Sequence, residues 1–442
     1  MKKRILYIIG SISIILVIIY LLRYKTGNDI SHNIPSDAVA VVNINLRNLE
    51  HHLLLDFLKH PLKYFNKSSG KKSNAPSLHD FYKAVDLDKN WVFYTTKSDY
   101  STWFSDAKMI NDKVVVETFL TAQKFDKKTI VKDKNVTDIF VKKNLYCILN
   151  TVANKKMIQF CYSTDNLQQI YERMPNNSSL TEESFIYQHL LKTPNDIVFV
   201  SKNKNIITAD FVDGAIDMNG NLESDFFQNT AIFSEDGLIS LDVKVNKKSE
   251  LYQTITKSVN RKKFAKITQM SFDSIQKYWD GDLHFHLRRF EKKKDTIKTY
   301  AYDDDFNKIE KIAVQNQFLP DFSFRIGTKS AINNYLIKNN VLQVVNNDSV
   351  FVAFPLVKTY CSVSKKQIDL YSKNPIKLAS KHAKLQLFFD LNHYRQQADS
   401  TLYRMSVFPR FSMLKLEIDG ENSLKGRLTT PYNRNAFVLL TE

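Results

Sequence analysis

Two histidines near the middle of the chain have a spacing that could bind a metal ion. His284 and His286 lie two residues apart in DLHFHLRRF, and Asp282 precedes them by the same spacing. Residues two apart on a β-strand share one face, so these three side chains would lie together. A zinc site needs three or four ligands, and no further ligand is evident. The sequence favours ordinary strand histidines, and we predict no metal and no cofactor.

An acidic motif, YDDDFN at residues 302–307, matches the first half of a calcium-binding loop. The loop would also need glycine at its sixth position and glutamate at its twelfth, and this chain has neither. We interpret the motif as an acidic turn that follows a strand.

The densest basic cluster follows the histidines. It consists of Arg288, Arg289, Lys292, Lys293 and Lys294. One interpretation is a site for an anionic lipid head group or an acidic glycan, in a chain whose net charge is +17. The other is a lysine-rich edge strand, whose charges prevent pairing with other strands. This cluster is the candidate ligand site.

Catalytic motifs are not found in the sequence. It contains no nucleophile elbow, P-loop, H-E-x-x-H pair or dinucleotide fingerprint. We therefore assign no catalytic residue and predict that the protein is not an enzyme. A hydrolase with an unrecognised site is an alternative.

Two of the three cysteines flank a predicted hairpin turn. Cys147 and Cys161 lie on either side of TVANKK, which would place them opposite each other or one residue apart. A disulfide between them is one possibility, which a compartment outside the cytoplasm would permit. Two ordinary buried thiols are the other. Cys361 has no partner in either case.

An apolar, uncharged run, ILYIIGSISIILVIIYLL, occupies residues 5–22. As a helix it would span about 27 Å, enough for the core of a bilayer. Lys2, Lys3 and Arg4 precede it and place residues 1–4 in the cytoplasm. We predict a single-pass signal anchor, and a cleaved signal peptide is the alternative.

The remainder of the chain has the length and composition of a globular body. The 442 residues are 43% hydrophobic, which fits two or three domains. We predict a linker over residues 23–34 and two extracytoplasmic α+β domains over residues 35–235 and 236–442. A body outside the cytoplasm does not meet nucleic acid, so no nucleic acid partner is predicted.

One local pattern recurs along this body: a strand, a polar helix cap and an amphipathic helix. It occurs at residues 34–52, 157–174, 238–255, 322–337 and 382–397. Hairpin signals separate the copies. The pattern predicts an α+β fold of mixed, largely antiparallel sheets with helices on one face, built from duplicated strand-cap-helix units and preceded by a transmembrane helix.

Four segments together resemble an uncharacterised family of Bacteroidota envelope proteins, a domain of unknown function. They are IPSDAVAVVNINLRNL, GDLHFHLRRF, TYAYDDDFNKIEKI and GRLTTPYNRNAFVLL. The resemblance implies the inner membrane, with the body in the periplasm. Unlike lipoprotein members, this chain has no lipidation cysteine near its start.

From these features we expect a non-enzymatic binding or envelope-assembly module with an envelope protein partner. A binder of anionic lipid or glycan is the alternative.

Overall fold

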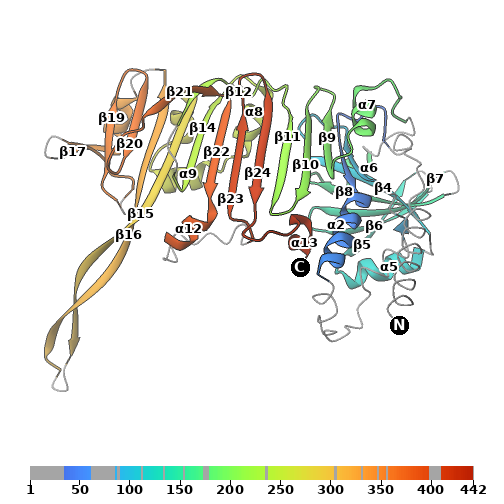
Figure 1. The fold of residues 1–442 in the computed structure, drawn as a ribbon, viewed down its shortest axis with the longest axis horizontal. Coiled ribbons are helices and arrows are strands. Elements are labelled where there is room, and N and C mark those ends of the chain that lie inside the picture. The colour runs from blue at the N-terminus through green and yellow to red at the C-terminus, as the bar shows by residue number, and fades with distance from the viewer. Residues whose placement is uncertain are drawn as a thin grey trace, which may run out of the picture. The chain divides into compact units, whose positions relative to one another are not determined.

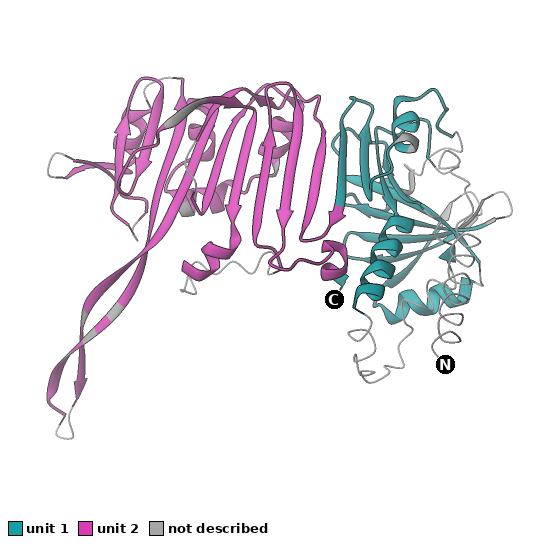
Figure 2. Ribbon diagram, in the orientation of Figure 1, with its two compact units in different colours: residues 1–210, 441–442 teal, residues 211–440 magenta. Residues whose placement is uncertain are grey.

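A computed structural model describes residues 34–60, 85–86, 90–110, 113–132, 135–152, 155–172, 179–233, 237–302, 306–329, 332–345, 348–354, 357–397 and 410–441. The chain forms two compact units, residues 1–210 with 441–442 and residues 211–440 (Figure 2). The predicted anchor at residues 5–22 lies outside the described residues. No helix within the described ranges is long and apolar enough to cross a membrane.

The boundary between the units follows residue 210, whereas the sequence placed it after residue 235. Strand β11 (Ala215–Asn221) pairs along its whole length with β24 (Ser423–Thr429). This long-range pairing ties the segment after residue 210 to the C-terminal strands. Local sequence patterns do not show which distant strands pair, so they do not place this boundary.

Unit 1 is a sheet of antiparallel strands with short helices. Its strands are β1 (Ala40–Asn45), β2 (Val85–Asp86), β3 (Asn90–Thr95), β4 (Thr102–Met109), β5 (Asp126–Lys132), β6 (Asn135–Lys142), β7 (Leu145–Val152), β8 (Lys155–Ser163), β9 (Ile197–Ser201) and β10 (Ile206–Val212), the last of which crosses the boundary. Its helices are α2 (Leu46–Lys59), α5 (Lys113–Ala122), α6 (Leu167–Glu172) and α7 (Phe185–Lys192). The strands pair in the order β10, β9, β1, β3, β4, β8, β7, β6 and β5, with β2 beside β4.

The cysteine pair lies in unit 1, on the hairpin that the sequence predicted. The register pairs Cys147 with Phe160 and Tyr146 with Cys161, so the two cysteines are offset by one residue. Side chains one residue apart along a strand point to opposite faces. Cys161 packs with Tyr94 in one core cluster, and Cys147 packs in another. The disulfide interpretation is therefore wrong: both thiols are free and buried.

This placement predicts inert thiols. Burial raises the pKa of Cys147, Cys161 and Cys361 to about 12, so almost none of each thiol is ionised at pH 8. We expect the native protein to resist alkylation by iodoacetamide. After unfolding without a reductant, all three cysteines should be alkylated, as measured by intact mass. Release of two of these thiols only after reduction would contradict the structure.

Unit 2 is a second antiparallel sheet, which curves beneath a layer of helices. Its strands are β11, β12 (Phe227–Gln228), β13 (Thr230–Phe233), β14 (Ile239–Val245), β15 (Trp279–Tyr302), β16 (Lys308–Thr328), β17 (Leu342–Val345), β18 (Asp348–Phe351), β19 (Thr359–Val363), β20 (Gln367–Tyr371), β21 (Leu378–Ala383), β22 (Leu385–Asp390), β23 (Met413–Ile418) and β24. Its helices are α8 (Glu250–Ser258), α9 (Arg261–Thr268), α10 (Phe272–Tyr278), α11 (Asn333–Lys338), α12 (Leu391–Gln397) and α13 (Ala436–Thr441). The strand order is β11, β24, β23, β22, β14, β15, β16, β20, β19, β18 and β17.

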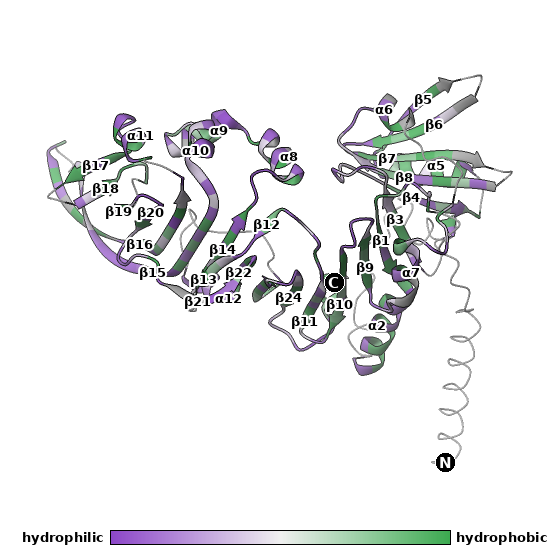
Figure 3. Ribbon diagram, turned by 90° about the horizontal axis from the view of Figure 1, so that it is seen from above, coloured by the Kyte–Doolittle hydropathy of each residue, from purple (hydrophilic) through white to green (hydrophobic). Residues whose placement is uncertain are grey.

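The two faces of the unit 2 sheet are covered differently. Helices α8 to α11 lie on one side of it, and the two-stranded sheet β13–β21 lies on the other (Figure 3). Strands β15 and β16 continue beyond their neighbours as a two-stranded arm (Figure 1). The predicted α+β class with largely antiparallel sheets is confirmed, and every pairing between named strands in the described chain is antiparallel.

All five predicted strand-to-helix transitions occur. Asn45 caps α2 by accepting from the backbone of Asn48 at 3.1 Å, and Ser249 caps α8. Asn166 caps α6 by accepting from the backbone nitrogen of Gln169 at 2.9 Å. Asp390 accepts from the backbone of His393 at 2.9 Å in α12. Helix α11 begins without a side-chain cap.

Candidate ligand-binding cleft

A bulge in β15 directs apolar side chains from two parts of the strand to one face. Leu287 pairs with Phe322, and Phe290 pairs with Pro320. The register shifts between Leu287 and Arg289, so one extra residue is accommodated there. Leu287 and Phe290 consequently share a face, although three positions separate them.

An apolar cleft of about 430 Å³ lies on this face. Its lining consists of Ile239, Phe285, Leu287, Phe290, Pro320, Phe322, Phe324, Phe354, Val357 and Tyr394. The volume lies within the range of small-molecule sites in proteins, roughly 300–1,000 Å³. Five phenylalanines and no charged residue line it, so the cleft suits a hydrocarbon rather than a polar ligand.

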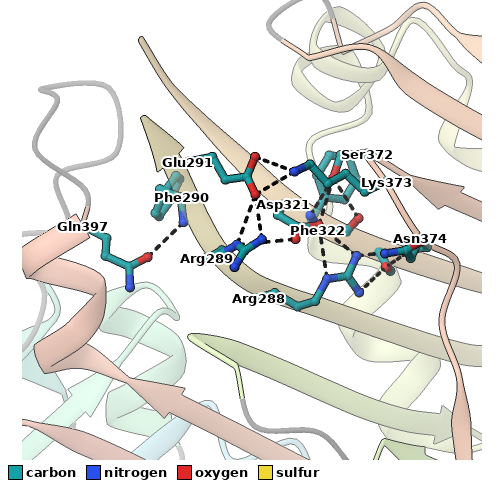
Figure 4. Close-up of polar contacts among 11 residues, drawn as sticks. Arg288, Arg289, Phe290, Glu291, Asp321, Phe322, Ser372, Lys373, Asn374 and Gln397 are labelled. Atoms are coloured by element: carbon teal, nitrogen blue, oxygen red, sulfur yellow. Dashed lines mark hydrogen bonds and ion pairs between the residues drawn. The ribbon is translucent and has the colours of Figure 1, made fainter. Parts of the chain in front are cut away.

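Helix α12 contributes Tyr394 to the lining of the cleft. The Tyr394 ring lies 5.6 Å from Phe290 and 5.4 Å from Phe389, at interplanar angles of 72° and 84°. Both are edge-to-face contacts, which aromatic rings prefer. Gln397, in the last turn of α12, accepts from the backbone nitrogen of Phe290 at 3.0 Å (Figure 4). These contacts fix the helix against the bulged strand.

Arg288 is held by protein groups and is not available to a ligand. It donates to Asp321 from Nε at 3.1 Å and from Nη2 at 2.9 Å, and also to Ser323 and to the carbonyl of Asn374 (Figure 4). Asp321 is only 6% exposed. A partly buried arginine with four such bonds stabilises the bulge, and breaking the pair would leave a buried charge.

Arg289 forms an ion-pair network with neighbouring charges. Its Nη2 lies 2.9 Å from Glu291, whose carboxylate also lies 2.6 Å from the Lys373 ammonium (Figure 4). Lys373, and after it Arg289, hold the pKa of Glu291 below its ordinary value. The network leaves one positive charge in excess at the base of the arm.

The remaining three lysines of the predicted cluster lie on the arm. Lys292 and Lys294 alternate with Lys293, so the first two share the face of Phe290 and the cleft. The Lys292 ammonium lies 6.0 Å from the ring centroid of Phe318, and all three lysines are exposed. The structure therefore does not bring the five residues together. Of the three lysines on the arm, Lys292 and Lys294 share the strand face of Phe290.

The two histidines lie on the opposite face of the sheet and are fully buried. His284 pairs with Asp242 at 2.8 Å and with Asp282 at 3.4 Å, and Asp282 also accepts from the Thr230 hydroxyl. Burial alone would lower the pKa of His284, but the two carboxylates raise it to about 9. The ring of His286 lies 4.2 Å from that of Phe233. Across the described ranges, no three His, Cys, Asp or Glu side chains are placed to hold a metal ion.

The sequence did not reveal the cleft. Phe285, Phe322 and Phe324 alternate along their strands, which is also the pattern of an ordinary core. A sharper signal was the departure from alternation at Leu287 and Phe290, which marks the bulge. A second basic run, NRKKFAKIT at residues 260–268, carries four basic residues at a lower density than residues 288–294.

Comparisons with known proteins give little guidance. No family model matches the chain, and no curated protein matches it. Among solved structures, TP0453 in crystal form IV aligns with a TM-score of 0.23 and 8% identity, covering 77% of this chain and 92% of that one. A similarity at this level does not establish a shared fold.

Proposed function

We propose that the protein is a membrane-anchored binding protein of the extracytoplasmic space, and that its ligand is an amphiphile with an acyl chain. The observation that carries this proposal is the cleft of about 430 Å³ with its phenylalanine-rich lining. Burial contributes about 0.8 kcal/mol per CH₂, so roughly eight methylenes would supply about 6 kcal/mol before the costs of association. An anionic head group would lie near Lys292.

Two features predicted from the sequence complete this proposal. The apolar run at residues 5–22 would hold the protein in the inner membrane, with the body in the periplasm, where envelope lipids are abundant. The recurring strand-cap-helix units support an origin by duplication. In particular, β1–α2 and β22–α12 both begin their helices with a side-chain cap, from Asn45 and Asp390.

A photoreactive fatty acid tests the cleft directly. The full chain in proteoliposomes is irradiated with a diazirine-bearing palmitate, and adducts are mapped by peptide mass spectrometry. We expect adducts on the β15 and β16 segments that carry Phe285 and Phe324. Val357→Trp should lower their yield at least tenfold, because the indole would occupy the cleft that Val357 lines.

The matched control is Val344→Trp, at a side chain that is 74% exposed and outside the cleft. It should leave the yield unchanged. Equal yields from both variants, or adducts spread over unrelated surface, would refute an acyl ligand in the cleft. The methyl ester of the probe tests the head group separately: an equal yield would remove Lys292 from the site but leave the cleft in it.

A second candidate function is binding of an envelope protein partner. The two-stranded arm formed by β15 and β16 supports it. Tyr302 and Ile312 are each 67% exposed, and Val314 is 65% exposed. The strand register places these three side chains on one face of the arm. Exposed apolar surface of this kind is typical of docking sites. Crosslinking in native membranes followed by mass spectrometry at high salt would identify such a partner, and recovery of lipid alone would exclude it.

A further inference from the structure

Helices α8 to α10 carry an excess of unpaired positive charge. Six exposed lysines in and beside them have no acidic partner within the described part of the chain: Lys248, Lys257, Lys262, Lys263, Lys266 and Lys277. Arg261, in contrast, forms an ion pair with Asp273 at 3.0 Å. The helices lie on the same side of the unit 2 sheet (Figure 3).

Aliphatic side chains accompany these lysines on α8. Leu251 and Ile255 lie one turn apart and are 44% and 46% exposed. The next residue after Leu251, Tyr252, is buried, so the helix packs through one side and presents aliphatic groups beside it. Lysines next to exposed leucine and isoleucine characterise helices that lie in the interface of an anionic membrane.

The helices are held firmly enough to act as one surface. Ser249, Asn260 and Ser271 cap α8, α9 and α10. The Phe264 and Phe272 rings lie 5.3 Å apart and join α9 to α10. Lys247 anchors the start of α8 by donating to the carbonyl of Trp279 at 2.7 Å. The backbone positions that carry the exposed lysines are therefore fixed before binding.

We propose that α8 and α9 form a docking surface for a bilayer of anionic phospholipid. Positive charge attracts such a bilayer, and Leu251 and Ile255 provide aliphatic groups that can enter its interface. A soluble polyanion would need only the charge. The inference does not depend on what fills the cleft. It assigns contact with the anionic membrane surface to residues 248–266, apart from the single ligand head group near Lys292.

The test uses the full chain in proteoliposomes, with an environment-sensitive fluorophore at Gln253→Cys on the exposed side of α8. The native cysteines are buried, so labelling should be confined to this position. We expect a blue-shifted, stronger emission in vesicles that contain phosphatidylglycerol, but not in pure phosphatidylcholine. High salt should reduce the difference, because it screens exposed charges.

Charge reversal provides the decisive comparison. We expect a triple variant to lower the ratio of docked to undocked protein more than about 100-fold. The variant carries Lys262→Glu, Lys263→Glu and Lys266→Glu, and each lysine near an anionic surface contributes a factor of roughly five to this ratio. The control reverses Lys365, Lys366 and Lys425, which are exposed elsewhere in unit 2, and has the same net charge. Equal emission from the two variants, or equal emission in both lipids, would overturn the proposal.

Discussion

Replacing Asp242 with asparagine should lower the free energy of unfolding of unit 2 by about 3 kcal/mol below pH 6.5, and the loss should fade towards pH 10. Asp242 is 1% exposed and lies 2.8 Å from Nδ1 of the fully buried His284. Breaking a buried pair by removing one charge leaves the other uncompensated. The pKa of His284, which Asp242 and Asp282 together raise from 6.5 to about 9, sets the upper bound of the pH-dependent part of the loss.

The direction of the pH dependence follows from the same shift. The pKa of His284 is higher in the folded state, so its protonation stabilises the fold fully below about pH 6.5. That contribution is lost as the pH rises through about 9. Other charges nearby do not alter this sign. Burial alone would raise the pKa of Asp282, but its pKa is lowered, so Asp282 keeps its charge in this pH range. Arg325 lies opposite His284 in the strand register and is paired with Asp369 at 2.5 Å.

The measurement is urea unfolding at several pH values, followed by hydrogen exchange in β14 and β15, which reports on unit 2 alone. The matched control is Asp321→Asn, because Asp321 is also nearly buried but pairs with Arg288. An arginine keeps its charge throughout this range, so the control should lose a constant amount. A constant loss in Asp242→Asn as well would show that His284 does not titrate in the folded state as described.

Replacing Gly281 with alanine should cost more than about 3 kcal/mol of unfolding free energy. Gly281 has φ +109°, in the region that favours glycine, and an added Cβ would lie 2.2 Å from the carbonyl oxygen of Val245. Backbone must move to relieve that contact. The movement would also displace Asp282, the next residue, and weaken its pairing with His284.

The same exchange and urea measurements apply to this variant, with Gly420→Ala as the control. A Cβ at Gly420 would meet its nearest atom, in the Asn229 side chain, at 3.5 Å, an ordinary contact. That variant should change stability by less than about 1 kcal/mol. If Gly281→Ala were equally mild, the backbone conformation at residue 281 would not require glycine.

The candidate site shows where inference from sequence alone reached its limit. Arg288 and Lys292 belong to one basic cluster in the sequence, but the bulge gives them different roles. Arg288 donates to Asp321, 33 residues away, whereas Lys292 extends along the arm beside Phe318. Charge density in a sequence does not show which charges the protein itself neutralises. Within the described ranges, the less densely spaced lysines of α9 have no such partners.

By itself, the sequence determined the local elements of this protein. Alternating apolar residues specify the strands, and polar side chains such as Asn45 and Ser249 begin the helices, because these preferences act between residues a few positions apart. The tertiary structure alone decided register and assembly. A one-residue offset placed Cys147 and Cys161 on opposite faces, and a bulge next to Leu287 created the cleft. The cleft joins Ile239 to Tyr394. The cleft depends on contacts between residues that are distant in the sequence. These contacts form only when the strands of the sheet have paired.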